Sequence, residues 1–330
     1  MTATTKTPKD PRVIALRNFA ISITVFNIVG YSFLGFEQPA LWPIVAVLTA
    51  YATDMALEVI GARGEDRPPR FLGRGVRGVV EFLYPAHITA LAVNMLLYVN
   101  DRIGVMLFGV IVAISGKWLL RAPVNGRLRH FMNPSNFGIS VVLLLFHWVA
   151  IAPPYHFTEN LHGWADWIIP VVIVIGGTML NGKLTKRMWL IAGWLSVFVV
   201  QAVVRGLILH TAIPGALAIM TGAAFILFTN YMVTDPGTTP TRPLSQFAFG
   251  GGVAAVYAAL TGASIVYGLF FATAIVCGIR GAFLWSLHIA REQERRRAEA
   301  ARPAPAAVEA GKAPAPEPAV PAGDRQKVAA

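Results

Sequence analysis

Long hydrophobic runs separated by short polar connections dominate the pattern of this chain. A membrane-spanning helix needs about 20 consecutive apolar residues. The pattern predicts ten such helices, over about residues 13–36, 39–60, 83–99, 103–121, 135–152, 166–181, 188–210, 213–233, 245–263 and 264–287. Only Thr261-Gly262-Ala263-Ser264 separates the last two runs, so nine spans is the main alternative. We therefore expect an all-α integral membrane protein.

Polar termini flank this hydrophobic region. Residues 1–12 are expected to form a polar tail, and residues 13–287 the transmembrane domain. Residues 288–330 begin as a charged helix and then become rich in Ala and Pro, a composition that cannot bury enough apolar surface to fold. We expect a disordered cytoplasmic tail there. The first run contains Arg17 and lacks a clear small-residue cleavage site, which argues against a cleavable signal peptide.

Basic residues occupy alternate connections between the runs. They lie before the first run and after the second, fourth, sixth, eighth and last runs, whereas the opposite connections carry Glu37, Asp101 with Arg102, and Glu159 with Asp166. Such an asymmetry places the basic loops and both termini in the cytoplasm, and it favours an even number of spans. With a net charge of +11 distributed in this way, the chain is expected to face anionic lipid and not nucleic acid. The predicted location is the bacterial cytoplasmic (inner) membrane.

A polar loop follows the predicted eighth span. It contains Thr234, Asp235, Thr238 and Thr239 directly after an apolar and small-residue segment. A loop that only reverses the chain needs Pro-Gly and little else. The added hydroxyls and carboxylate therefore suit a polar ligand, while a stiff exposed turn is the alternative.

A second polar segment lies on the same predicted side of the membrane. Pro134 is placed to begin a helix, with Asn133 as its N-cap. His130, Asn133 and Asn136 then present imidazole and amide edges that can pair with a heteroaromatic ring. The alternative is a capped helix start without a ligand. If both polar segments face one compartment, they can line one site.

The sequence offers no other recognisable centre of chemistry. Its seven histidines form no i, i+4 pair, and Cys277 is its one cysteine, so neither a metal site nor a haem site is predicted. No catalytic motif of a stand-alone enzyme is present, so a role as a component of a membrane oxidoreductase stays open.

The helix ends carry a family resemblance. Gly116-Lys117, Asn133-Pro134 and Thr234-Asp235-Pro236 resemble motifs of the membrane flavoprotein family that includes RnfD of the Rnf electron-transport complex and NqrB of the sodium-pumping NADH:quinone oxidoreductase. The similarity covers about residues 40–285. The opening 19–24 and the Asp-Pro-Gly-Thr-Thr-Pro form of the loop are most similar to the UnbU branch, which is associated with enediyne biosynthesis gene clusters.

The resemblance implies two inverted five-helix halves and a flavin near the cytoplasmic side, close to Asn133. The implied cofactor is FMN or riboflavin, bound non-covalently. Covalent attachment of FMN is not expected, because the loop 161–166 lacks the family's Ser/Thr-Gly-Ala-Thr motif, and the near match at 261–264 is out of order. Where the family has a further asparagine, this chain has His130.

Ionisable groups inside the spans are candidates for function. Asp54 and Glu58 lie one helical turn apart, and we expect them to pair with the basic loop 63–77, with an ion or proton site as the alternative. Lys117 is expected to extend to the headgroups, although it can also neutralise a flavin phosphate.

Three functions follow from these observations. The first is flavin-dependent electron transfer that supports natural-product biosynthesis of the enediyne type, with redox partner proteins at the cytoplasmic face. The second is a transporter or export factor for a hydrophobic product. The third is a membrane scaffold that recruits soluble enzymes through the charged tail.

Overall fold

The computed structural model describes residues 11–124 and 126–301 as a helical protein. The parts of the two predicted tails at 1–10 and 302–330 lie outside the described residues. Contacts divide the chain into one unit that ends at Ser286 and a second that begins at Leu287. The helices are α1 (Pro11–Val29), α2 (Trp42–Gly64), α3 (Gly75–Leu96), α4 (Ile103–Leu119), α5 (Pro134–Leu145), α6 (Ile168–Met179), α7 (Met188–Leu209), α8 (Ile213–Ala218), α9 (Ala223–Leu227), α10 (Pro243–Gly262) and α11 (Gly268–Ala300).

Short elements complete the described chain. Five-residue π-helical turns extend α1, α6 and α9: η1 (Gly30–Leu34), η4 (Leu180–Leu184) and η6 (Phe228–Met232). The 3-10 turns are η2 (Pro154–Phe157), η3 (Gly163–Trp167) and η5 (Ile219–Thr221). Two antiparallel pairs of strands also form: β1 (Leu97–Tyr98) with β4 (Ala150–Ile151), and β2 (Arg121–Val124) with β3 (Arg127–His130).

The lengths of the helices support membrane insertion. Seven helices among the described residues are long and apolar enough to span a bilayer, and eight if the bent pair 213–221 and 223–232 is one span. Helices α4 and α5 are shorter, with 17 and 12 residues. At 1.5 Å per residue, α5 covers only about 18 Å of a hydrocarbon core that is about 30 Å thick. The membrane class is supported, whereas ten spans and inverted halves stay predictions.

Two helix boundaries are informative: one differs from the prediction, and the other separates the last two runs as predicted. The predicted span 135–152 is wrong at its end, because the helix stops at Leu145 and the following apolar residues turn into β4. Between α10 and α11, Ser264 and Tyr267 have positive φ angles of 59° and 61°. A right-handed helix cannot continue through such residues, so the last two hydrophobic runs are separate helices.

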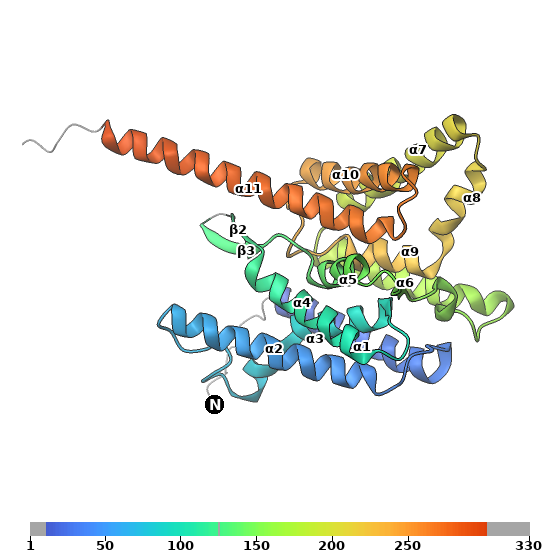
Figure 1. Ribbon diagram of the computed structural model, residues 1–330, viewed down its shortest axis with the longest axis horizontal. Coiled ribbons are helices and arrows are strands. Elements are labelled where there is room, and N and C mark those ends of the chain that lie inside the picture. Colours follow the sequence, from blue (N-terminus) through green and yellow to red (C-terminus); the bar gives the residue numbers. More distant parts are fainter. Residues whose placement is uncertain (1–10, 125, 302–330) are drawn as a thin grey trace, which may run out of the picture. The chain divides into compact units, whose positions relative to one another are not determined.

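Within residues 11–286, α1–α4 lie on one side, α7 and α10 on the other, and α5, α6 and α9 between them (Figure 1). Glycines allow the closest of these approaches. A Cβ atom added to Gly250 would lie 2.2 Å from the carbonyl oxygen of Leu190, and one on Gly193 would lie 2.2 Å from that of Phe247. Small residues at helix interfaces are how membrane helices gain contact area without a hydrophobic driving force.

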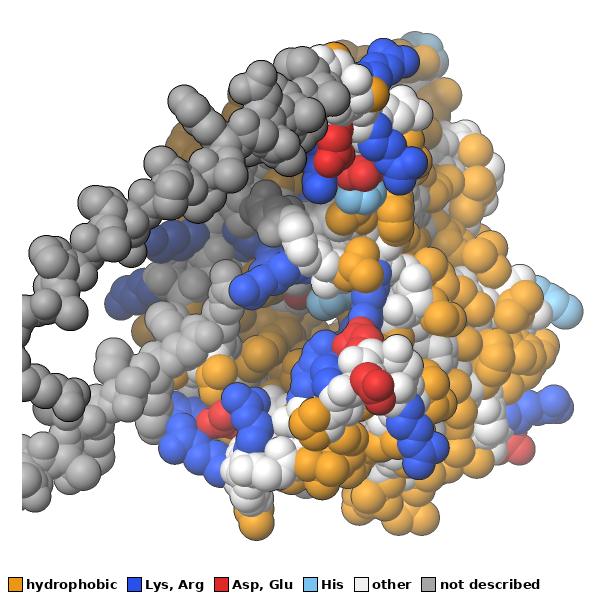
Figure 2. Space-filling model, turned by 90° about the vertical axis from the view of Figure 1, so that its left-hand side faces the viewer, with side chains coloured by type: hydrophobic (Ala, Val, Ile, Leu, Met, Phe, Trp, Pro, Cys, Tyr) orange, Lys and Arg blue, Asp and Glu red, His pale blue; other side chains and the backbone are white. Residues whose placement is uncertain are grey.

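Charged side chains gather at one end of the molecule. Figure 2 shows Lys and Arg residues, with a few acidic partners, on the side that forms the left edge of Figure 1, near the β2–β3 hairpin. Hydrophobic side chains cover much of the surface beyond it. This separation matches a helical bundle whose apolar surface contacts lipid and whose charged end faces water.

Candidate functional site

The structure joins the two polar segments. Asn133 caps α5 as predicted, because its Oδ1 accepts a hydrogen bond of 3.1 Å from the backbone N–H of Asn136. Its Nδ2 donates across the molecule to the carbonyl oxygen of Met232, at 3.0 Å. Met232 immediately precedes the Val233–Pro243 loop. The start of α5 is therefore tied directly to the loop of Asp235.

Asp235 organises its own loop. Its Oδ1 accepts from the backbone N–H of Gly237 at 3.1 Å, and its Oδ2 accepts from Thr238 Oγ1 at 3.0 Å. Thr239 Oγ1 donates to the main-chain oxygen of Asp235, and Thr234 Oγ1 donates to that of Asn230. Each of these carboxylate and hydroxyl groups thus has a hydrogen-bond partner within the chain, and most of these partners are main-chain groups. They shape and stiffen the turn, and a ligand beside it has to be recognised by other groups.

His130 touches this turn at a glycine. A Cβ atom added to Gly237 would lie 2.6 Å from His130 Nε2, so any other residue at position 237 would displace the imidazole. Burial lowers the pKa of His130, Asp235 opposes that shift, and the cations Lys117, Arg121 and Arg129 add to it. The ring is therefore neutral at pH 7. A neutral imidazole has one donor and one acceptor for a partner.

Arg187, at the N-cap of α7, supports the loop. Its sequence position alone does not mark it as a site residue. Its side chain is buried, Nε donates to Thr239 Oγ1 at 2.9 Å, and an Nη donates to the carbonyl oxygen of Pro236 at 3.3 Å. Burial lowers the pKa of Arg187. The negative charge of Asp235 opposes this shift, and the positive charges of Arg280 and Arg129 add to it. Arg280 is an ionisable residue within an apolar run, and that signal could have marked it.

Asn136 retains an unused acceptor. Its Nδ2 donates to the carbonyl oxygen of Phe270 at 3.0 Å, whereas its Oδ1 is buried and has no hydrogen-bond partner among the described residues. A buried acceptor left in this state costs about 1–3 kcal/mol. A donor from a ligand or a water molecule would remove that cost. Among the residues predicted for the site, Asn136 thus offers an unpartnered amide oxygen at this junction.

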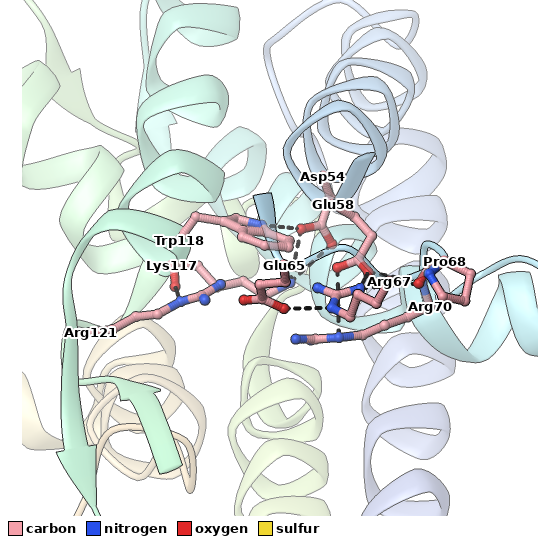
Figure 3. Close-up of polar contacts among 9 residues, drawn as sticks. All are labelled: Asp54, Glu58, Glu65, Arg67, Pro68, Arg70, Lys117, Trp118 and Arg121. Carbon is pink, nitrogen blue, oxygen red and sulfur yellow. Dashed lines mark hydrogen bonds and ion pairs between the residues drawn. The ribbon is translucent and has the colours of Figure 1, made fainter. Parts of the chain in front are cut away.

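Asp54 and Glu58 form a separate network in the C-terminal half of α2 (Figure 3). Lys117 of α4 lies 3.0 Å from Asp54 Oδ2, and Trp118 Nε1 donates to Asp54 Oδ1 at 2.8 Å. The predicted extension of Lys117 to the headgroups is wrong, because the ammonium group turns inward to this carboxylate. Neither acidic residue is exposed.

Glu58 pairs with the basic loop, as expected from the sequence. The same expectation is wrong for Asp54, because Asp54 pairs with Lys117 of α4. Glu58 forms an ion pair with Arg67, and its Oε1 accepts from the backbone N–H of Arg70 at 2.8 Å. Arg70 Nε lies 3.7 Å from Glu58 Oε2. Each acidic residue therefore has its own cation, and the network joins α2, α4 and the loop after α2.

An apolar cavity of 220 Å³ lies between the two sides of the bundle. Its lining includes Phe19 and Phe26 of α1 and Ile173 of α6, with Ser22 and Tyr231 as hydroxyl groups. Part of the lining comes from Ala224–Met232, the second half of the broken span, which bends by 66° at Gly222. The cavity thus adjoins the chain segment that leads into the Asp235 loop.

Comparison of the sequence with protein-family models and with curated proteins finds no match. The fold and the paired polar loops define a helical multipass protein in contact with the lipid bilayer. Further assignment depends on the geometry of the site.

Proposed function

We propose that the chain is a flavin-binding redox protein of the bacterial cytoplasmic membrane, built from two inverted halves with both termini in the cytoplasm. The observation that carries the proposal is the junction of the two polar loops, in which Asn133 binds the carbonyl oxygen of Met232 and His130 abuts Gly237. The resemblance to RnfD, NqrB and the UnbU branch supports it. Electrons would pass to or from partner proteins at the cytoplasmic face.

The groups at the junction fit the polar edge of a flavin bound non-covalently. The edge carries carbonyl acceptors and one ring N–H donor, and the unpartnered Oδ1 of Asn136 is an acceptor for that donor. The neutral His130 and nearby guanidinium groups are donors for the carbonyls. When bound, a flavin supplies hydride and electron chemistry, while surrounding charge tunes its potential. Thr234, Asp235, Thr238 and Thr239 would act through the shape of the loop.

Cofactor analysis of the purified full-length protein tests this proposal. We expect a flavin absorption band and an extractable flavin, both lost or strongly reduced in Asn133→Ala and Asp235→Ala. Asn94→Ala is the matched control, since Asn94 is also buried and its Nδ2 donates to Tyr31, between α3 and η1. Colourless protein that retains no flavin after purification and binds none when supplied would sink the proposal.

A second candidate is export of a hydrophobic product. The broken span and the adjoining apolar cavity favour it, because discontinuous helices line the substrate sites of many secondary transporters. Replacement of Gly176, which borders the cavity, by Leu should then reduce export of the product from cells. Distribution of the product that is unchanged by deletion of the whole protein would contradict this second function.

A further inference from the structure

Three arginine residues on three different elements lie near the loop junction, and the charges of Arg129 and Arg280 reach Arg187. Arg187 binds the turn itself, through Thr239 and Pro236. Arg129 precedes His130 in β3. Arg280 on α11 precedes Gly281, where an added Cβ atom would lie 2.4 Å from the ring of Phe131. Arg187 thus contacts the loop directly, whereas Arg129 and Arg280 are each next in sequence to a residue that packs beside the junction.

These cations lack counter-charges of their own. Among the described residues, none of the three has a carboxylate oxygen within 4.0 Å. Asp235 is the acidic residue whose charge reaches Arg187, and both of its oxygens already accept hydrogen bonds from its own turn. The local charge is thus three guanidinium groups against one carboxylate.

The burial of Arg187 makes this imbalance costly. The residue is 5% exposed and binds only neutral oxygens. A buried charge costs several kcal/mol unless an opposite charge or a full set of hydrogen bonds compensates it. Elsewhere in this protein the buried charges are paired, as for Asp54 with Lys117. An anchoring role in the turn accounts for two donors of Arg187. It does not account for the additional positive charges of Arg129 and Arg280 near the same loop.

We propose that this arginine cluster, Arg129, Arg187 and Arg280, binds the phosphoryl group of a flavin nucleotide. The inference rests on the proposed function and chooses FMN over riboflavin. A phosphate monoester carries a charge near −2 at pH 7 and three acceptor oxygens, which matches the excess of positive charge. The planar guanidinium fork suits phosphate geometry better than an ammonium group does.

Flavin titration tests the assignment without any redox assay. Full-length protein in nanodiscs of zwitterionic phosphatidylcholine is titrated with FMN and with riboflavin, and quenching of flavin fluorescence gives each Kd. We expect FMN to bind at least about tenfold more tightly, since charge-assisted hydrogen bonds contribute that much or more. The preference should disappear in Arg187→Gln. It should persist in Arg242→Gln, an exposed cation beside the same loop.

Arg280→Gln is the second variant, because Arg280 makes no hydrogen bond with the turn and its loss leaves the loop contacts intact. We expect a smaller reduction in the preference for FMN. Equal affinities of the wild type for the two flavins, or an unchanged preference in both variants, would overturn the inference and leave the flavin proposal standing. Loss of the preference when phosphatidylglycerol is added to the nanodiscs would assign the cluster to lipid headgroups and overturn it as well.

Thermal unfolding in inorganic phosphate separates this inference from the proposed function. If neither flavin binds, the flavin proposal fails. Stabilisation of the wild type by phosphate over chloride at equal ionic strength, absent in Arg187→Gln and present in Arg242→Gln, would still establish the phosphoryl site. The same unfolding temperature in both salts, together with no preference for FMN, would refute it.

Discussion

The buried pair of Asp54 and Lys117 makes a quantitative prediction. In Lys117→Met, Asp54 keeps the hydrogen bond of 2.8 Å from Trp118 but loses the Nζ contacts at 3.0 and 3.1 Å. Asp54 is 0% exposed, so solvent cannot replace the lost cation. Removal of one partner from a buried ion pair costs about 3–5 kcal/mol. We expect a reduction of that size in the free energy of unfolding.

The reverse substitution should cost less. In Asp54→Asn the side chain can still accept from Trp118, and the side chain of Lys117, already 19% exposed, can turn toward water or headgroups. We expect a loss of about 1–2 kcal/mol, as for a neutral hydrogen-bonded group. The double variant removes both charges together, and such replacements are often close to neutral. Asp54→Asn should therefore rescue Lys117→Met. With a double variant near zero, the coupling energy is the sum of the two single losses, about 4–7 kcal/mol.

Unfolding by SDS in mixed micelles, followed by far-UV circular dichroism, measures all four members of this cycle. The control is the same cycle on Arg77 and Glu81, an i, i+4 pair at 2.8 Å in which the arginine side chain is 71% exposed. Its coupling energy should stay below about 1 kcal/mol. If Lys117→Met costs no more than Arg77→Met, or if Asp54→Asn fails to rescue it, the pair does not stabilise the helix contact as we argue.

The remaining predictions concern the loops and helix contacts. Burial lowers the pKa of His156 to about 4. In the unfolded chain the imidazole binds a proton near pH 6.5. The free energy of unfolding should therefore be highest above pH 6.5 and fall by up to about 3 kcal/mol as the pH drops toward 4. His156→Leu should flatten that dependence in unfolding titrations at several pH values. Asn133→Ala should lower the free energy of unfolding by about 1–3 kcal/mol, because it removes the helix cap and the bond to Met232; a value near zero would contradict the tie between the loops. Gly250→Leu should destabilise the contact between α7 and α10 strongly, while Gly252→Leu should be milder, because a Cβ atom there meets nothing closer than 4.0 Å; equal losses on SDS titration would refute the close approach.

The helices and one cap were predictable because they depend on local sequence. Hydrophobic length located most of the helical segments, and the order Asn133-Pro134 identified both the N-cap and the first residue of α5. Hydrophobic length alone gave a wrong prediction for residues 146–152, because a short apolar run has the same pattern whether it continues a helix or forms a strand. The pairing of β4 with β1, whose residues lie more than 50 positions earlier, decided that case.

The partners of the buried charges were harder to predict because they depend on distant contacts. Arg187 follows Lys183 and Lys186, so the sequence identifies it only as one of the basic residues after the sixth hydrophobic run. In the structure it reaches a loop whose Thr239 is 52 residues away. Lys117 and Asp54 are 63 residues apart. Charge counting assigns such residues to a predicted side of the membrane, but only the packing of helices determines which of them turn inward.

The β2–β3 hairpin connects the acidic network with the loop junction. Trp118 donates to Asp54, and Arg121 stacks over the Trp118 ring with its Cζ 4.5 Å from the centroid. Arg121 then pairs in register with His130, which abuts Gly237. Arg121, which stacks on a residue that holds Asp54, and His130, which abuts the Asp235 loop, therefore face each other in one short ladder. Packed elements shift as units and not side chain by side chain. A rearrangement of the Asp54 network that moves β2 must therefore also move the imidazole of His130 at the junction. The hairpin thus gives the two polar sites a physical basis for acting together.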